Sequence, residues 1–173
     1  MATTTNKVSC GSTTVLTVTN LQPLTNSITA GWQSARVSNL STLALDYEIS
    51  FKLPTANTAP ANDKCVYVYI SEGYTTDGGT TWIQDDVGNG TVPSGSEGTI
   101  TVLSNATGPM SSKLLGTIPY FTQNMTMQKT FKLSSIAGQF MPDGFQIILV
   151  NYTGAALSTG CVVDVTPING TNS

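Results

Sequence analysis

Carboxylates are the side chains best suited to acid–base chemistry in this chain, because its 173 residues include no histidine. That absence excludes Ser-His-Asp and Cys-His catalysis, histidine-ligated metals and the usual proton shuttle. Two carboxylate pairs, Asp46 with Glu48 and Asp85 with Asp86, remain as a candidate acid and base for glycoside hydrolysis. We expect the first pair on the polar face of a strand and the second in a turn. We therefore expect that the protein is not an enzyme.

The three cysteines form no recognisable site. Cys10, Cys65 and Cys161 lie far apart and make no C-x-x-C pair, so the sequence predicts neither a zinc site nor a disulfide framework. A free thiol packs as a small hydrophobic side chain. Cys65 fits that role best because it opens the apolar segment CVYVYI.

Calcium is the one cofactor for which donor residues can be named. Asp77, Asp85 and Asp86 would bind Ca²⁺, together with nearby carbonyl groups, if loops brought them together. Their spacing does not match the EF-hand loop, and acidic residues in turns more often bond to their own backbone. We therefore expect no cofactor and no metal site.

The segment Thr75–Trp82, TTDGGTTW, resembles the Asp-box of sialidases and other glycan-active β-propellers, whose pattern is S/T-x-D-x-G-x-T-W. In that family the box braces a hairpin away from the active site. The resemblance implies a structural hairpin built by Asp77, Gly79, Thr81 and Trp82, with the carboxylate bonded to backbone amides and the indole packed beneath. Sialidases repeat the box and bind a carboxylate with three arginines, whereas this chain has one box and one arginine. We therefore expect a brace rather than a glycan site.

Composition limits the classes of partner. Only 10% of the residues are charged, against about 25% in typical proteins, and the net charge is −3. One arginine and six lysines cannot neutralise many phosphates, so we expect no nucleic acid partner. No apolar run is long enough to span a membrane, and Met1–Thr5 has neither the basic nor the apolar region of a secretory signal. We expect a soluble protein with no membrane partner.

Strand-like segments recur at short intervals and are separated by turn-rich stretches, a rhythm typical of sandwiches and barrels. The segments are 13–19, 27–37, 43–53, 65–71, 80–84, 99–103, 113–118, 125–133, 145–152 and 161–166. Leu45, Tyr47, Ile49, Phe51 and Leu53 alternate with polar residues, which predicts one buried face. The continuously apolar segment 145–150 predicts a central strand, and 134–140 is the only plausible helical turn. The predicted fold is all-β: a single jelly-roll or β-sandwich of about eight to ten short antiparallel strands.

The two ends of the chain are more polar than its middle. We predict a polar N-terminal arm at 1–12, one β-sandwich domain at 13–168 and a polar C-terminal tail at 169–173. Free tails and tails that dock on a neighbouring subunit are both compatible with this composition.

Four segments resemble capsid decoration, or cement, proteins of tailed bacteriophages. They are NDKCVYVYI (62–70), KLLGTIP (113–119), FKLSSIAG (131–138) and MPDGFQIILVNYTGAAL (141–157). The family pattern has an NDKAVYVY strand, an LLGTI strand and a late lP.kwgivv.N.tGaaL segment, in the same order. The chain departs from it at Cys65, which replaces a small apolar residue, and at Asp143-Gly-Phe, which replaces a basic-Trp-Gly turn. Neither departure affects a residue that would carry out chemistry.

The resemblance implies a non-enzymatic jelly-roll protein that binds the outer capsid surface and stabilises the shell. It implies the major capsid protein as partner, a homo-oligomer in which a trimer is favoured and a dimer is possible, and synthesis in the host bacterial cytoplasm. The candidate capsid-contact arm consists of Ala2, Thr3, Thr4, Thr5, Asn6 and Lys7.

Two alternatives remain open. One is a virion β-domain associated with the tail or a fibre. The other is a carbohydrate-binding β-sandwich module, suggested by five aromatic residues that are equally compatible with a core: Trp32, Tyr74, Trp82, Tyr120 and Tyr152.

Overall fold

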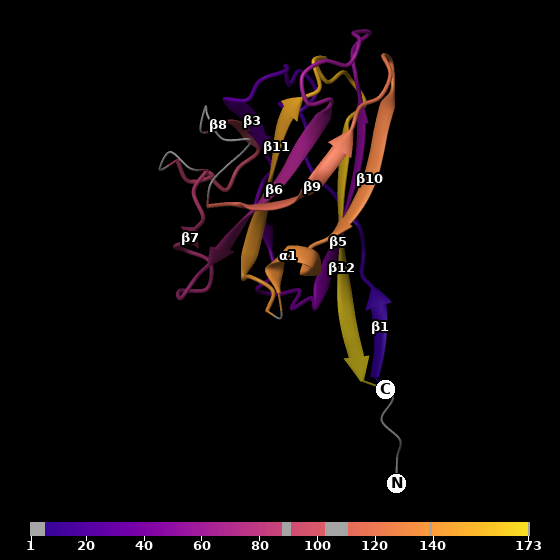
Figure 1. The fold of residues 1–173 in the computed structure, drawn as a ribbon. Coiled ribbons are helices and arrows are strands. Elements are labelled where there is room, and N and C mark those ends of the chain that lie inside the picture. The colour runs from indigo at the N-terminus through magenta and orange to yellow at the C-terminus, as the bar shows by residue number, and fades with distance from the viewer. Residues whose placement is uncertain (1–5, 88–90, 103–110, 139, 173) are drawn as a thin grey trace.

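Two antiparallel β-sheets packed face to face make up this protein (Figure 1). The computed structural model describes residues 6–87, 91–102, 111–138 and 140–172. Within these residues the only helix is α1 (Ser134–Ala137), in the segment where the sequence predicts a helical turn. The prediction of an all-β sandwich is confirmed.

The strands are shared between a five-stranded and a seven-stranded sheet. The first sheet has the order β1 (Asn6–Cys10), β12 (Val162–Asn172), β5 (Asp46–Pro54), β10 (Thr126–Lys132), and β2 (Thr14–Val15) also pairs with β12. The second has the order β7 (Ile83–Gln84), β6 (Cys65–Tyr74), β11 (Gly144–Tyr152), β3 (Ala30–Gln33), β8 (Gly98–Thr101). In that sheet β4 (Val37–Ser38) also pairs with β11, and β9 (Lys113–Pro119) with β6.

Eight of these strands have the connectivity of a jelly roll. Their spatial orders are β2-β12-β5-β10 in the first sheet and β3-β11-β6-β9 in the second. Along the chain these eight alternate between the sheets, except that β6 and β9 lie in the same one. This is the double Greek key of a jelly roll. The segment between β6 and β9 adds β7 and β8 at the edges of the second sheet.

Alternation along β5 places one face in the core. Its inward residues Tyr47, Ile49, Phe51 and Leu53 are at most 3% exposed, while Lys52 faces outward and is exposed. Leu45 was expected on the same inward face, and the structure corrects this: it precedes the first residue of β5 and is 60% exposed. The alternation rule holds only inside the paired strand.

The β11 strand is covered on both sides, as its continuous apolar sequence predicts. Phe145, Ile147 and Leu149 face the main core between the sheets. Ile148 and Val150 belong to a second apolar cluster on the opposite face, to which Val87, Ile100 and Val102 also belong.

The described residues form twelve strands rather than eight to ten. One reason is that the single strand expected over 27–37 is split into β3 and β4 by Ser34. The Ser34 backbone N–H donates to the Ile147 carbonyl (2.9 Å), and its hydroxyl accepts from the Ile147 N–H (2.9 Å). From Gln33 to Val37 the chain advances four residues, while the opposing β11 advances three, from 148 to 145. At this one-residue bulge the Ser34 hydroxyl therefore replaces a backbone carbonyl as the acceptor for the Ile147 N–H.

The structure corrects the expected ends of the domain. Asn6 and Lys7, expected in the polar N-terminal arm, lie in β1, which pairs with β12 in the register Asn6↔Asn172 to Cys10↔Ile168. The expected tail is therefore strand up to Asn172, while residues 2–5 of the arm and residue 173 lie outside the described residues. Backbone hydrogen bonds hold this pair together. Side-chain periodicity does not report such bonds when neither strand buries a face.

Candidate functional site

β1 and the last part of β12 form a two-stranded terminal ribbon, residues 6–10 with 168–172, that projects beyond the sandwich (Figure 1). The neighbouring strand β5 begins at Asp46, opposite Ile168. Beyond that point the chain contributes one more ladder contact, from the Leu45 N–H to the Ile168 carbonyl (2.8 Å). In the part of the chain that the structure describes, β1 is thus the only strand paired with residues 169–172.

One face of the terminal ribbon is apolar and open to solvent. Residues directly opposite one another share a face, so Val8 lies beside Gly170 and Cys10 beside Ile168. A Cβ atom added at Gly170 would come within 2.9 Å of Leu45 Cδ1, so Leu45 extends over the glycine. Val8 is 73% exposed and Leu45 60%. We call Val8, Cys10, Leu45 and Ile168 the apolar ribbon face.

The outer edge of β1 presents backbone groups for pairing. The Gly11 N–H donates to the Pro167 carbonyl (2.7 Å), and bonding residues alternate along an antiparallel ladder. Ser9 therefore bonds toward β12, whereas Val8 and Cys10 direct their N–H and C=O groups to the opposite edge. No described strand lies on that side of β1.

The Asp-box-like segment forms a compact turn between β6 and β7. The Asp77 carboxylate accepts hydrogen bonds from the Thr81 N–H (2.8 Å) and the Thr75 hydroxyl (2.8 Å). The bond from the Thr81 amide is the main reason why the pKa of Asp77 is lowered to about 2. The Trp82 indole N–H donates to the Gly79 carbonyl (2.8 Å). All four residues singled out from the sequence therefore meet in one turn.

Trp82 anchors this turn on the second sheet. A Cβ atom would come within 3.1 Å of the indole at Gly73 and within 2.9 Å at Gly144, so only glycine allows the contact without rearrangement. The Arg36 guanidinium lies 4.3 Å from the ring centroid and donates to the Gln84 side chain (2.7 Å). Because the guanidinium covers one face of the ring, that face cannot stack on a sugar.

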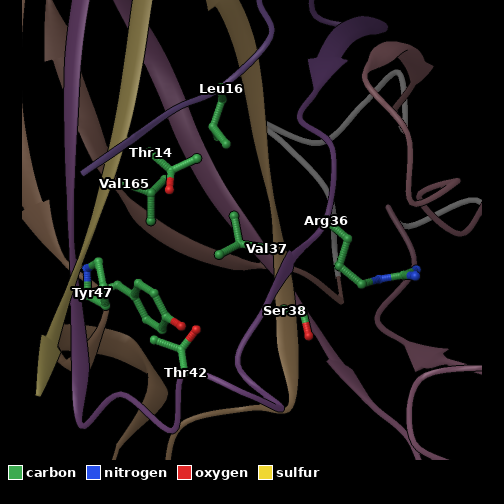
Figure 2. A pocket seen from close by; sticks show the side chains of 9 residues that line it. Thr14, Leu16, Arg36, Val37, Ser38, Thr42, Tyr47 and Val165 are labelled. Atoms are coloured by element: carbon green, nitrogen blue, oxygen red, sulfur yellow. The ribbon is translucent and has the colours of Figure 1, made fainter. Parts of the chain in front are cut away.

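A cavity of about 240 Å³ opens between the edges of the two sheets (Figure 2). It is lined by Thr14, Leu16, Arg36, Val37, Ser38, Thr42, Tyr47, Val165 and Pro167. Figure 2 shows the Arg36 side chain directed away from it. The Tyr47 hydroxyl donates to the Asn39 side chain (2.8 Å), and burial raises the pKa of Tyr47. No carboxylate is among the residues that line this cavity, so it offers no acid–base pair.

Two of the four candidate carboxylates, Asp46 and Asp86, accept hydrogen bonds from serine residues. Asp46 accepts hydrogen bonds from the backbone N–H (2.8 Å) and hydroxyl (2.7 Å) of Ser134, which ties β5 to the start of α1. Asp86 accepts from the Ser111 hydroxyl (2.8 Å). Burial raises the pKa of Asp85. Over the described ranges, no three Asp, Glu, Cys or His residues are grouped as a metal site would require.

Sequence reasoning missed an ion pair whose carboxylate is buried and whose ammonium group is partly exposed. Glu72 is 4% exposed and accepts a hydrogen bond from the Lys113 ammonium group (2.6 Å), whose pKa this bond raises. The Tyr74 hydroxyl also donates to Glu72 (3.3 Å). The partners lie on β6 and β9, so only the pairing of those strands brings them together.

The aromatic residues considered for glycan binding do not all reach the surface. Trp32 and Tyr120 are fully buried, with hydrogen bonds from the indole to Glu97 (2.7 Å) and from the phenol to the Thr58 carbonyl (2.6 Å). They belong to the core. Tyr74 is 49% exposed and Tyr152 is half-buried.

The thiols differ in exposure. Cys65 and Cys161 are buried, and burial raises the pKa of Cys161 to about 11, whereas Cys10 is exposed on the terminal ribbon. Across the described residues, no helix combines the length and hydropathy needed to cross a membrane. A scan against protein-family models found no match, and no curated protein sequence matches the chain.

Proposed function

We propose that this protein is a non-enzymatic component of a bacteriophage virion that binds the outer capsid surface and stabilises the shell. The observation that carries the proposal is the terminal ribbon, which presents an apolar face away from the sandwich. The sequence resemblance to decoration proteins over residues 62–157 supports the choice of partner, the major capsid protein. The jelly-roll connectivity agrees with the fold that this resemblance implies.

The outer face of the first sheet suits contact with a shallow polar surface. Its exposed hydroxyl groups are paired across strands, Thr13 with Thr166 (2.7 Å) and Ser50 with Thr130 (2.9 Å). Such paired groups need little reorganisation on contact. Several weak contacts of this kind become tight in combination when copies joined in one oligomer bind neighbouring positions of a symmetric shell. A virion protein of the tail or of a fibre is the second candidate, because the same surfaces would bind neighbouring proteins at those places.

The direct test is to purify virions, locate this chain by cryo-electron microscopy and measure binding of the protein to shells that lack it. We expect saturable binding to the outer shell and a higher temperature of shell disruption. A location on the tail, or no binding to shells, would reject the proposal.

Two matched variants test the role of the terminal ribbon. Val8→Asp places a charge on the apolar ribbon face, and Val15→Asp places one on β2, where the valine is 67% exposed. We expect shell occupancy to fall at least tenfold for Val8→Asp, equivalent to about 1.4 kcal/mol, and to change little for Val15→Asp. Equal occupancy of both variants would show that the shell is bound elsewhere.

A further inference from the structure

The terminal ribbon lacks the support that most strands have. An isolated two-stranded ribbon is marginally stable in water, and a third strand or a packed face is usually needed. Here the apolar ribbon face is exposed, with Val8 at 73% and Leu45 at 60%. The projection of this ribbon is therefore best explained by a partner that completes it.

The open edge of β1 is suited to another strand. Val8 and Cys10 direct their backbone N–H and C=O groups away from β12, as the Gly11–Pro167 bond establishes. Proteins usually protect such an edge with proline, charged side chains such as lysine, a bulge or a very short strand. β1 has no proline and one charged residue, Lys7, and its pairing with β12 is continuous over all five residues.

We propose that β1 pairs antiparallel with β1 of a second copy of this chain, about a two-fold axis at Val8. Only some registers of an antiparallel self-pairing place opposite side chains on the same face of the sheet. Of these registers, only the one centred on Val8 pairs all five residues of β1. It places Val8 against Val8 and Lys7 against Ser9. A shift by one residue in each copy toward the N-terminus would place Lys7 against Lys7, which is unfavourable.

The pairing joins the apolar faces of both copies. The two-fold axis is perpendicular to the combined sheet, so β12-β1-β1-β12 becomes one four-stranded sheet with both apolar ribbon faces on the same side. Each Val8 exchanges two backbone hydrogen bonds with its counterpart, because its groups point to the open edge.

This inference goes beyond the proposed function, since it concerns how two copies meet and not what they bind. A pairing of identical strands is isologous and closes at two copies. Of the two oligomers that the resemblance allows, this edge therefore builds the dimer. A two-fold pair would give a shell-binding protein two attachment points.

Cysteine cross-linking tests the register in the intact protein. In a Cys10→Ser background, one preparation carries Lys7→Cys and another Ser9→Cys, and both are oxidised alone and mixed. In the proposed register residues 7 and 9 form a non-hydrogen-bonded pair, with Cα atoms about 4.5 Å apart, within the range for a disulfide. We expect covalent dimers in the mixture and few in either preparation alone. Dimers of Lys7→Cys alone or Ser9→Cys alone, or none in the mixture, would overturn the register.

Sedimentation velocity tests the edge itself. Val8→Pro removes an N–H that β12 does not use, so the sandwich and ribbon should remain folded, whereas Val8→Thr keeps the N–H and the branched Cβ. We expect the wild type and Val8→Thr to dimerise as concentration rises, and the dissociation constant of Val8→Pro to rise at least 100-fold. Far-ultraviolet circular dichroism confirms folding of each variant. A monomeric wild type, or a Val8→Pro variant that dimerises normally, would reject the proposal.

Discussion

The sandwich body and the terminal ribbon use the same strand, β12, in different ways. In the body, Val163 and Val165 are at most 2% exposed and pack in the core between the sheets. In the ribbon, Val8 beside β12 is 73% exposed and its strand is held by backbone hydrogen bonds. One half of β12 therefore buries side chains in the core, and its other half holds β1, whose outer edge has no described strand beside it.

The body and the ribbon should differ most in how much a buried or an exposed side chain contributes to stability. Phe145 is fully buried and packs edge-to-face against Tyr47, with ring centroids 5.1 Å apart. Phe145→Ala should lower the free energy of unfolding by about 3–5 kcal/mol, as measured by denaturant titration. Val8→Ala should change it by no more than about 0.5 kcal/mol, as for other exposed positions. A loss above about 2 kcal/mol for Val8→Ala would mean that the ribbon contributes to the stability of the body, and the two regions would not differ as described.

A smaller effect is expected at the ion pair between β6 and β9. Lys113→Met leaves the Glu72 carboxylate buried without its cation. Because the Lys113 side chain is 43% exposed, we reduce the usual cost of breaking a buried pair to about 1–2 kcal/mol. Adding Glu72→Gln to Lys113→Met should recover part of the loss, because the buried charge is then removed. No recovery in the double variant would mean that Lys113 stabilises by packing alone.

The ion pair also has a defined pH dependence. The pKa of Lys113 is raised in the folded protein, so its contribution is complete below the unfolded pKa of about 10.4 and is lost as pH rises through the folded pKa. The stability difference between the wild type and Lys113→Met should therefore be constant near neutral pH and shrink above about pH 10.5. Denaturant titrations at a series of alkaline pH values would measure it. A difference that grows with pH would contradict the assignment.

The turn at Asp77 predicts the opposite pH dependence. Its folded pKa of about 2 lies below the ordinary value of about 3.9, so its contribution is present above pH 4 and is lost as pH falls toward 2. Asp77→Asn should remove that part of the acid dependence of unfolding while leaving stability at neutral pH only slightly lower. Thermal unfolding between pH 2 and 5 would measure it. Identical acid slopes for the wild type and Asp77→Asn would show that the carboxylate does not brace the turn.

Sequence reasoning succeeded for the elements whose side-chain pattern reflects burial or a local turn. The alternation in β5 and the apolar run of β11 follow from burial, and the turn at Asp77 joins residues within a short motif. It missed β1 because nothing in the pattern of residues 6–10 indicates a buried face. It also missed the contact of Arg36 with Trp82, since residues 46 positions apart meet only after β4 and β7 are placed.

The smallest difference between the body and the ribbon is expected at single backbone amides. In dilute protein, where the monomer dominates, the Ser9 amide bonded to β12 should exchange its hydrogen more slowly than the amides of Val8 and Cys10, which face the open edge. Dimerisation should slow exchange at Val8 and Cys10 and leave Val163, deep in the body, unchanged. Hydrogen exchange followed by NMR at low and high concentration measures both. Protection at Val8 that is already high in the monomer would mean that its N–H bonds within the chain. The open edge, and the two-fold pairing built on it, would then be wrong together.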